Sequence, residues 1–115
     1  MIRFANQAQP EIRENMRGGE GAVTLTPAFQ PGDCQAKLRL FSRITLPAGA
    51  SIGYHVHEGE EELFYFLSGT AEFNDNGTLH TVHAGDATVT GSGQGHSVRN
   101  TGDAPVEILA VIAAL

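Results

Sequence analysis

Turn-forming residues recur so often in this chain that only short extended segments fit between them. It contains fourteen glycines and five prolines among 115 residues. The pair Asn76-Gly77 is a strong signal for the two-residue turn of a β-hairpin. Turns spaced about eight to twelve residues apart are typical of β-sandwiches and closed β-barrels. We therefore predict an all-β fold.

About nine segments match short strands by their alternation or by their β-branched and aromatic content. They are residues 22–29, 37–46, 51–57, 61–67, 70–74, 78–82, 87–90, 96–100 and 106–112. Residues 11–17 are polar, and we interpret them as a short helical or irregular segment. The length fits a single domain over residues 1–115, with residues 1–20 as an N-terminal extension and residues 37–112 as the barrel core.

Charge and hydropathy exclude several classes of partner. The net charge is −6, from thirteen acidic and seven basic residues. Nucleic-acid-binding proteins neutralise phosphates with Lys and Arg, so we expect no nucleic-acid partner. No segment approaches the roughly 18 apolar residues that span a bilayer, and the start lacks the apolar stretch of a signal peptide. We expect a soluble cytoplasmic protein without a membrane partner. The single cysteine, Cys34, excludes an internal disulfide.

Two histidines one residue apart are the most informative feature for function. If His55-Val56-His57 lies on a strand, both imidazoles share a face and lie about 6.6 Å apart along the backbone, close enough to share one ion. A bend then returns Glu62 toward that face, and His96 follows a later glycine-rich loop. Three imidazoles and one carboxylate suit Mn, Fe, Co, Ni or Zn better than Ca or Mg. The sequence therefore predicts one divalent transition-metal ion on these four side chains.

Strand parity distinguishes two neighbouring carboxylates. Glu62 shares its face with Phe64 and Phe66, whereas Glu61 points to the opposite face with Leu63. We assign Glu62 as the ligand and keep Glu61 as the alternative.

Four residues are candidates for the walls of a substrate pocket. Phe64, Phe66 and Val98 would make the walls apolar, which suits a small substrate and excludes water. Arg39 shares its strand face with Phe41, so it reaches the metal pocket if that face is interior; the other interpretation is a solvated strand residue. His80 and His83 face opposite sides of a strand, and we interpret both as surface residues.

Two spaced sets of residues resemble the two motifs of the cupin family. Gly49-x5-His55-x-His57-x4-Glu62-x6-Gly69 matches the first motif at every fixed position. Gly85-x5-Gly91-x-Gly93-x2-His96-x3-Asn100 matches the second, except that Gly91 stands where proline is usual. The resemblance implies a small one-domain bacterial cupin with a double-stranded β-helix, or jelly-roll barrel. It also implies metal on the four residues above, a structural amide at Asn100 and pairing into a homodimer.

The resemblance leaves the reaction open, because cupins host many activities on one fold. Our first hypothesis is an enzyme whose metal (Mn, Fe, Ni or Zn, with Mn or Fe favoured) binds a small carboxylate or oxyanion for oxalate-type decarboxylation or oxidation, or for oxygen insertion. We can place no general acid or base. The alternative is a non-catalytic protein that binds a small anion or uses the metal structurally. A sugar-phosphate isomerase is a third hypothesis, disfavoured because the seven basic residues are scattered.

Overall fold

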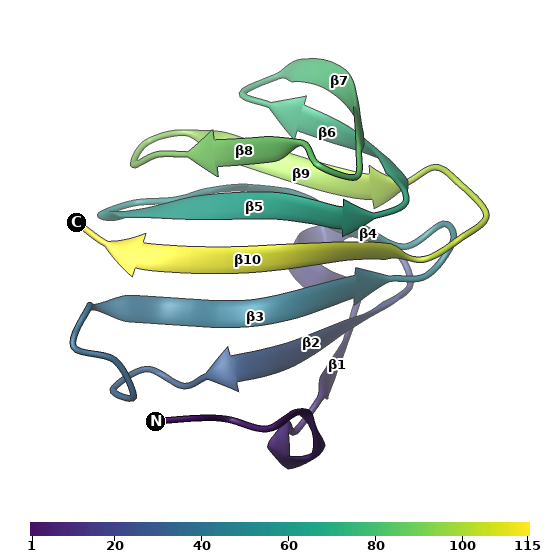
Figure 1. The fold of residues 1–115 in the computed structure, drawn as a ribbon. Coiled ribbons are helices and arrows are strands. Elements are labelled where there is room, and N and C mark those ends of the chain that lie inside the picture. The colour runs from purple at the N-terminus through teal and green to yellow at the C-terminus, as the bar shows by residue number, and fades with distance from the viewer.

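Two antiparallel β-sheets packed face to face make up the protein (Figure 1), in a computed structural model that describes all 115 residues. The strands are β1 (Glu11–Glu14), β2 (Ala22–Phe29), β3 (Leu38–Leu46), β4 (Ser51–Val56), β5 (Glu60–Ser68), β6 (Thr70–Asp75), β7 (Thr78–His83), β8 (Ala87–Thr90), β9 (Gly95–Asn100) and β10 (Val106–Ala114). One sheet has the order β1-β2-β3-β10-β5-β8 and the other the order β4-β9-β6-β7. This is the double-stranded β-helix that the motif resemblance implies, and the all-β fold predicted from the turns is confirmed.

The only helical segments are two 3-10 turns near the N-terminus, η1 (Ala5–Gln7) and η2 (Met16–Gly18). Neither has the length or the apolar character that crossing a bilayer requires.

Alternation along β5 decides which side chains face the interior. Glu62, Phe64 and Phe66 are buried, whereas Leu63 and Tyr65 are exposed. Because successive side chains of a strand point to opposite faces, the buried carboxylate and the two aromatic rings share the inner face. The parity expected from the sequence is confirmed.

A core of fifteen buried hydrophobic residues fills the space between the sheets. Leu46, Phe66 and Ile108 come from the six-stranded sheet, and Ile52 and Phe73 come from the four-stranded sheet. Burial of each large apolar side chain contributes roughly 1.5–3 kcal/mol. The core therefore gives the strands that carry functional side chains a rigid support.

Gly69 connects β5 to β6 in a conformation that other residues avoid. Its φ is 88°, in the left-handed region, and a Cβ there would lie 2.8 Å from the carbonyl oxygen of Pro105. Both observations explain why this motif position holds glycine.

The N-terminal part differs from the sequence prediction. Glu11–Glu14 forms strand β1 and pairs antiparallel with β2, so the prediction of a helical or irregular segment is wrong there. All four of its side chains are exposed, so no hydrophobic alternation marks the strand, and pairing with β2 determines it. Val23 and Leu25 of β2 belong to the core, so the barrel begins well before residue 37.

Candidate metal centre

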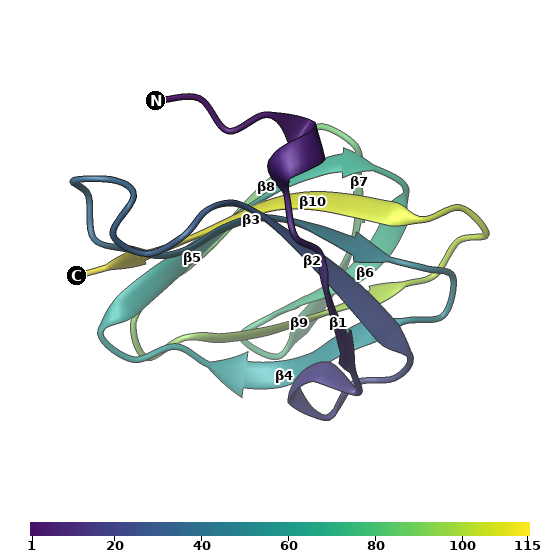
Figure 2. The same ribbon diagram turned by 90° about the horizontal axis from the view of Figure 1, so that it is seen from below.

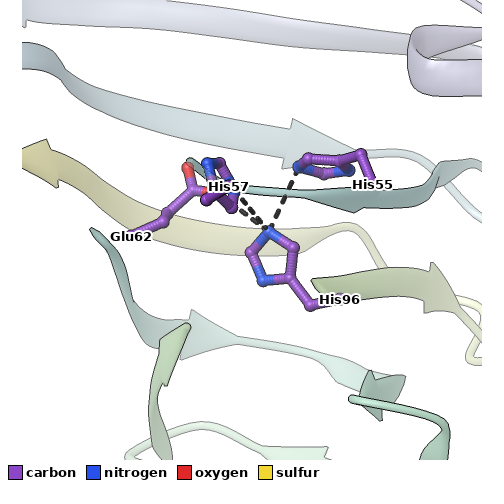
Figure 3. A group of neighbouring side chains, drawn as sticks. All are labelled: His55, His57, Glu62 and His96. Atoms are coloured by element: carbon purple, nitrogen blue, oxygen red, sulfur yellow. Dashed lines mark hydrogen bonds and ion pairs between the residues drawn. The ribbon is translucent and has the colours of Figure 1, made fainter. Parts of the chain in front are cut away.

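The four predicted ligands come together from three strands and one adjoining loop (Figure 3). His55 on β4 pairs directly with His96 on β9, which places both rings on the inner face of the four-stranded sheet. His57 follows the end of β4, and Glu62 approaches from β5 of the opposite sheet. We call these four residues the His/Glu cluster.

One atom of each side chain points to the same spot. The Nε2 atom of His96 lies 3.1 Å from Nε2 of His57, 3.2 Å from Nε2 of His55 and 2.9 Å from Oε1 of Glu62. Nε2 of His57 lies 3.1 Å from the same carboxylate oxygen. Figure 3 shows dashed lines converging on the ring of His96.

The other nitrogen of each ring has a partner outside the cluster. Nδ1–H of His55 donates to the carbonyl oxygen of Gly53 at 2.7 Å, and Nδ1–H of His57 donates to Oε1 of Glu60 at 2.9 Å. Nδ1 of His96 lies 2.9 Å from the hydroxyl of Thr90. A neutral imidazole with its proton on Nδ1 has a free lone pair on Nε2. The outer partners therefore direct the lone pairs of His55 and His57 into the cluster.

The cluster fits a single divalent transition-metal ion. Two ligands at right angles, each about 2.1 Å from an ion, lie about 3 Å apart, which matches the separations of 2.9–3.2 Å around His96. Three imidazole nitrogens and one carboxylate oxygen suit the first-row transition metals, whereas Ca and Mg prefer oxygen ligands alone. Imidazoles oriented through their second nitrogen are also characteristic of metal sites.

Glu60 on β5 links the cluster to Arg39 on β3, two strands away in the same sheet. Its carboxylate accepts hydrogen bonds from Nε and Nη2 of Arg39, at 2.7 Å and 2.8 Å, in addition to the bond from His57. These hydrogen bonds, first from Arg39 and then from His57, lower the pKa of Glu60 to about 2. Glu60 is therefore a carboxylate under all ordinary conditions and holds the ring of His57.

Burial lowers the pKa of His55, and the neighbouring imidazoles of His96 and His57 lower it further. The hydrogen bond to Gly53 acts in the opposite direction. The net effect favours the neutral ring, which is the form that binds a metal.

A cavity of about 630 Å³ opens beside the cluster. Three of the four cluster side chains, His55, His57 and Glu62, line it together with Phe64 and Arg39. Several residues of the N-terminal segment, between Gln9 and Arg17, also line it. A small ligand in this cavity could therefore reach the cluster.

The family model described as Cupin domain matches residues 42–112, a range that contains the whole His/Glu cluster. The chain is a cupin. The match covers more than half of its length, and the two sheets have the arrangement that the motif resemblance implies.

Two comparisons with Thermotoga maritima extend the similarity over the whole cupin chain. The protein named oxalate-binding protein is 44% identical over 115 residues, which cover 100% of this chain and 95% of the relative. The crystal structure of a predicted oxalate decarboxylase superposes with a TM-score of 0.95 at 43% identity and covers 100% of both chains. A structure from Thermus thermophilus is 27% identical, with a TM-score of 0.70 over 80% of this chain and 83% of that one.

The predicted pocket residues divide into two pairs in this cupin. Phe64 and Arg39 line the cavity, and the guanidinium of Arg39 is engaged by Glu60. Phe66 and Val98 are instead buried in the core at 1% and 2% exposure and do not line the cavity, so their prediction as walls is corrected. Phe66 shares the inner face of β5 with Glu62, and Val98 shares that of β9 with His96, but both lie deeper in the barrel.

The remaining candidates are Glu61, His80, His83 and Asn100, and none of them belongs to the His/Glu cluster. Glu61 lies next to Glu62 on β5 but is not part of the cluster, and His80 and His83 are exposed. Asn100 is buried and bonds to the backbone at both ends of its amide.

Several residues of the site escape sequence reasoning. Glu60 belongs to an acidic run that resembles a solvated loop, and Thr90 has no motif that marks it. Arg13 and Arg17 join Arg39 at the cavity, so three of the seven basic residues, scattered in sequence, gather at one site. Only the pairing of strands and the path of the N-terminal segment reveal these neighbours.

Proposed function

We propose that the His/Glu cluster binds one divalent transition-metal ion, with Mn or Fe favoured, and that the loaded protein binds a small carboxylate or oxyanion, with oxalate as the first candidate. The observation that carries this proposal is the convergence of three imidazole Nε2 atoms and one carboxylate oxygen at the wall of an open cavity. Four protein ligands leave two positions of an octahedral ion for a bidentate ligand. A bound ion would act there as a Lewis acid and a template.

The lining of the cavity supports an anionic ligand. Arg13, Arg17 and Arg39 bring positive charge to its walls, while Phe64 and Leu40 supply apolar surface that limits water. Guanidinium groups recognise carboxylates through paired hydrogen bonds. The similarity to an oxalate-binding protein over the whole chain agrees with this ligand class.

Oxalate decarboxylation is the second candidate, supported by the similarity to a predicted oxalate decarboxylase. A decarboxylase also needs a group that carries a proton to the product. Besides Glu62, which we assign to the metal, the cavity wall contains one other carboxylate, Glu11. Glu11 is paired with Arg13 at 2.9 Å. The cluster and the arginines of the cavity therefore support oxalate binding. Decarboxylation would in addition require a proton for the product, from Glu11 or from water.

The test measures metal content and oxalate binding together. Protein expressed in medium containing Mn and Fe is analysed for metals and titrated with oxalate by calorimetry, and the mixture is assayed for formate and CO2. We expect about one metal ion per chain and saturable oxalate binding. His96→Ala should lose both, whereas His80→Ala, with an exposed histidine outside the cluster, should retain both. Oxalate binding of equal strength by metal-free protein would contradict the proposal.

We also propose that the protein forms a homodimer through the outer face of the six-stranded sheet. Leu63, Tyr65 and Leu67 of β5 and Val89 of β8 are all exposed on that face. Contiguous apolar surface of this kind is typical of contact sites between chains. Light scattering should give twice the chain mass, and Tyr65→Glu should shift the protein to the monomer; a monomeric wild type would contradict this.

A further inference from the structure

The N-terminal segment is held against the barrel by two contacts that only glycine permits. A Cβ on Gly53 of β4 would overlap the carbonyl oxygen of Arg17, and a Cβ on Gly19 would overlap the carbonyl oxygen of Ser51. The backbones of η2 and β4 therefore touch directly, and η2 lies beside β4 (Figure 2). This contact holds Arg17 in a defined place at the edge of the cavity.

Arg17 occupies a backbone conformation that disfavours any side chain. Its φ of 55° and ψ of 31° lie in the left-handed region, where residues other than glycine are uncommon. This conformation is unfavourable for an L-residue because its Cβ comes too close to the following carbonyl oxygen. Position 17 holds an arginine, although glycine would adopt this conformation without steric cost and occupies the next two positions.

Arg17 also differs from the other cationic residues of the cavity in having a free charge. Arg39 forms an ion pair with Glu60 at 2.7 Å, and Arg13 forms one with Glu11 at 2.9 Å. Arg17 forms no ion pair and donates no side-chain hydrogen bond within the protein. Its guanidinium is therefore available to an anion in the cavity.

We propose that Arg17 binds the second carboxylate of a dicarboxylate ligand whose first carboxylate binds the metal ion held by the His/Glu cluster, and so selects dianions over monoanions. This rests on the proposed function and names its ligand class. Arg17 lines the same cavity as His55, His57 and Glu62, which places it beside the cluster. The cavity of about 630 Å³ has room for dicarboxylates longer than oxalate.

The experiment compares a dianion with a monoanion on protein loaded with Co(II). Oxalate, malonate and acetate are titrated by calorimetry into wild type, Arg17→Gln, Arg17→Lys and Arg43→Gln. The visible spectrum of the Co(II) centre is recorded during each titration, to show that the chelating ligands leave the metal in place. Arg43→Gln is the matched control, because Arg43 is an exposed arginine that pairs with Glu107 and does not line the cavity.

We expect Arg17→Gln to bind oxalate and malonate at least 10-fold more weakly and acetate within about twofold of wild type, with Co(II) affinity unchanged. Arg17→Lys should recover part of the loss, because lysine keeps the charge but not the planar fork. Dianion binding by Arg17→Gln equal to wild type, or an equal loss in Arg43→Gln, would overturn the inference alone. If loaded wild type binds none of the three anions, the proposed function fails and this inference fails with it.

Discussion

Thr90 and His96 meet inside the barrel, with the hydroxyl of Thr90 2.9 Å from Nδ1 of His96. Thr90 ends β8 and is fully buried, and its register partner on β5 is Glu62. Thr90 therefore lies beside Glu62 in the six-stranded sheet and orients His96 of the four-stranded sheet. The hydroxyl fixes which nitrogen of His96 faces the cluster.

The Thr90→Val variant should therefore weaken metal binding by about 10-fold or more, because loss of an outer hydrogen-bond partner releases the ring of its ligand. Valine has nearly the same shape, so the core should remain filled. Thr90→Ser keeps the hydroxyl and is the control. Titration with Co(II) measures the affinities, and equal affinity of Thr90→Val and wild type would show that packing alone orients His96.

Glu60→Gln should also lower the metal affinity, by about 10-fold. The carboxylate accepts from His57 and from Arg39 at once, and an amide oxygen is a weaker acceptor for both. Glu58→Gln is the matched control, because Glu58 is exposed and outside this network. Arg39→Gln should have a smaller effect in the same direction. If Glu58→Gln weakens binding as much as Glu60→Gln does, the general loss of negative charge explains the result.

Removal of the metal should lower the thermal stability. A ligand that binds only the folded state at a concentration 100 times its Kd stabilises that state by about 2.7 kcal/mol, which corresponds to roughly 10 °C in Tm for a domain of this size. Scanning calorimetry of wild type with Mn and with a chelator measures the difference. His96→Ala should show almost no difference between the two conditions. A shift of equal size in that variant would place the stabilising metal elsewhere.

Alternation and spacing, together with the motif resemblance, predict which four side chains meet in the cluster, because each lies on or beside a strand whose two faces are distinguishable in sequence. The choice of Glu62 over Glu61 follows from this parity, and the structure agrees. Parity states which face a residue occupies but not its depth. For that reason the sequence predicts Phe66 and Val98 at the pocket, although they lie in the core.

The residues around the cluster depend on contacts that no short pattern encodes. Glu60 acquires its role from Arg39, 21 residues earlier in the chain, through pairing of their side chains. Strand β1 has no buried side chain, so its sequence is indistinguishable from that of a polar loop. Arg17 reaches the cavity because Gly19 and Gly53 let two backbones touch, which is visible only in three dimensions.

Asn100→Ala should be the most destabilising single amide substitution in the chain. Its Nδ2 group donates to the carbonyl oxygens of Leu46 and Ala104, both at 2.9 Å, and its Oδ1 atom accepts from the backbone N–H of Gly102. Asn100 is 2% exposed, so water cannot replace these bonds. Each buried group left without a partner costs about 1–3 kcal/mol, and we expect a loss of about 3 kcal/mol or more in the free energy of unfolding. Chemical denaturation measures it, with Asn74→Ala, whose amide is half-buried and accepts only from Gly77, as the control. A loss no larger than that of the control would show that the turn after β9 closes without the amide.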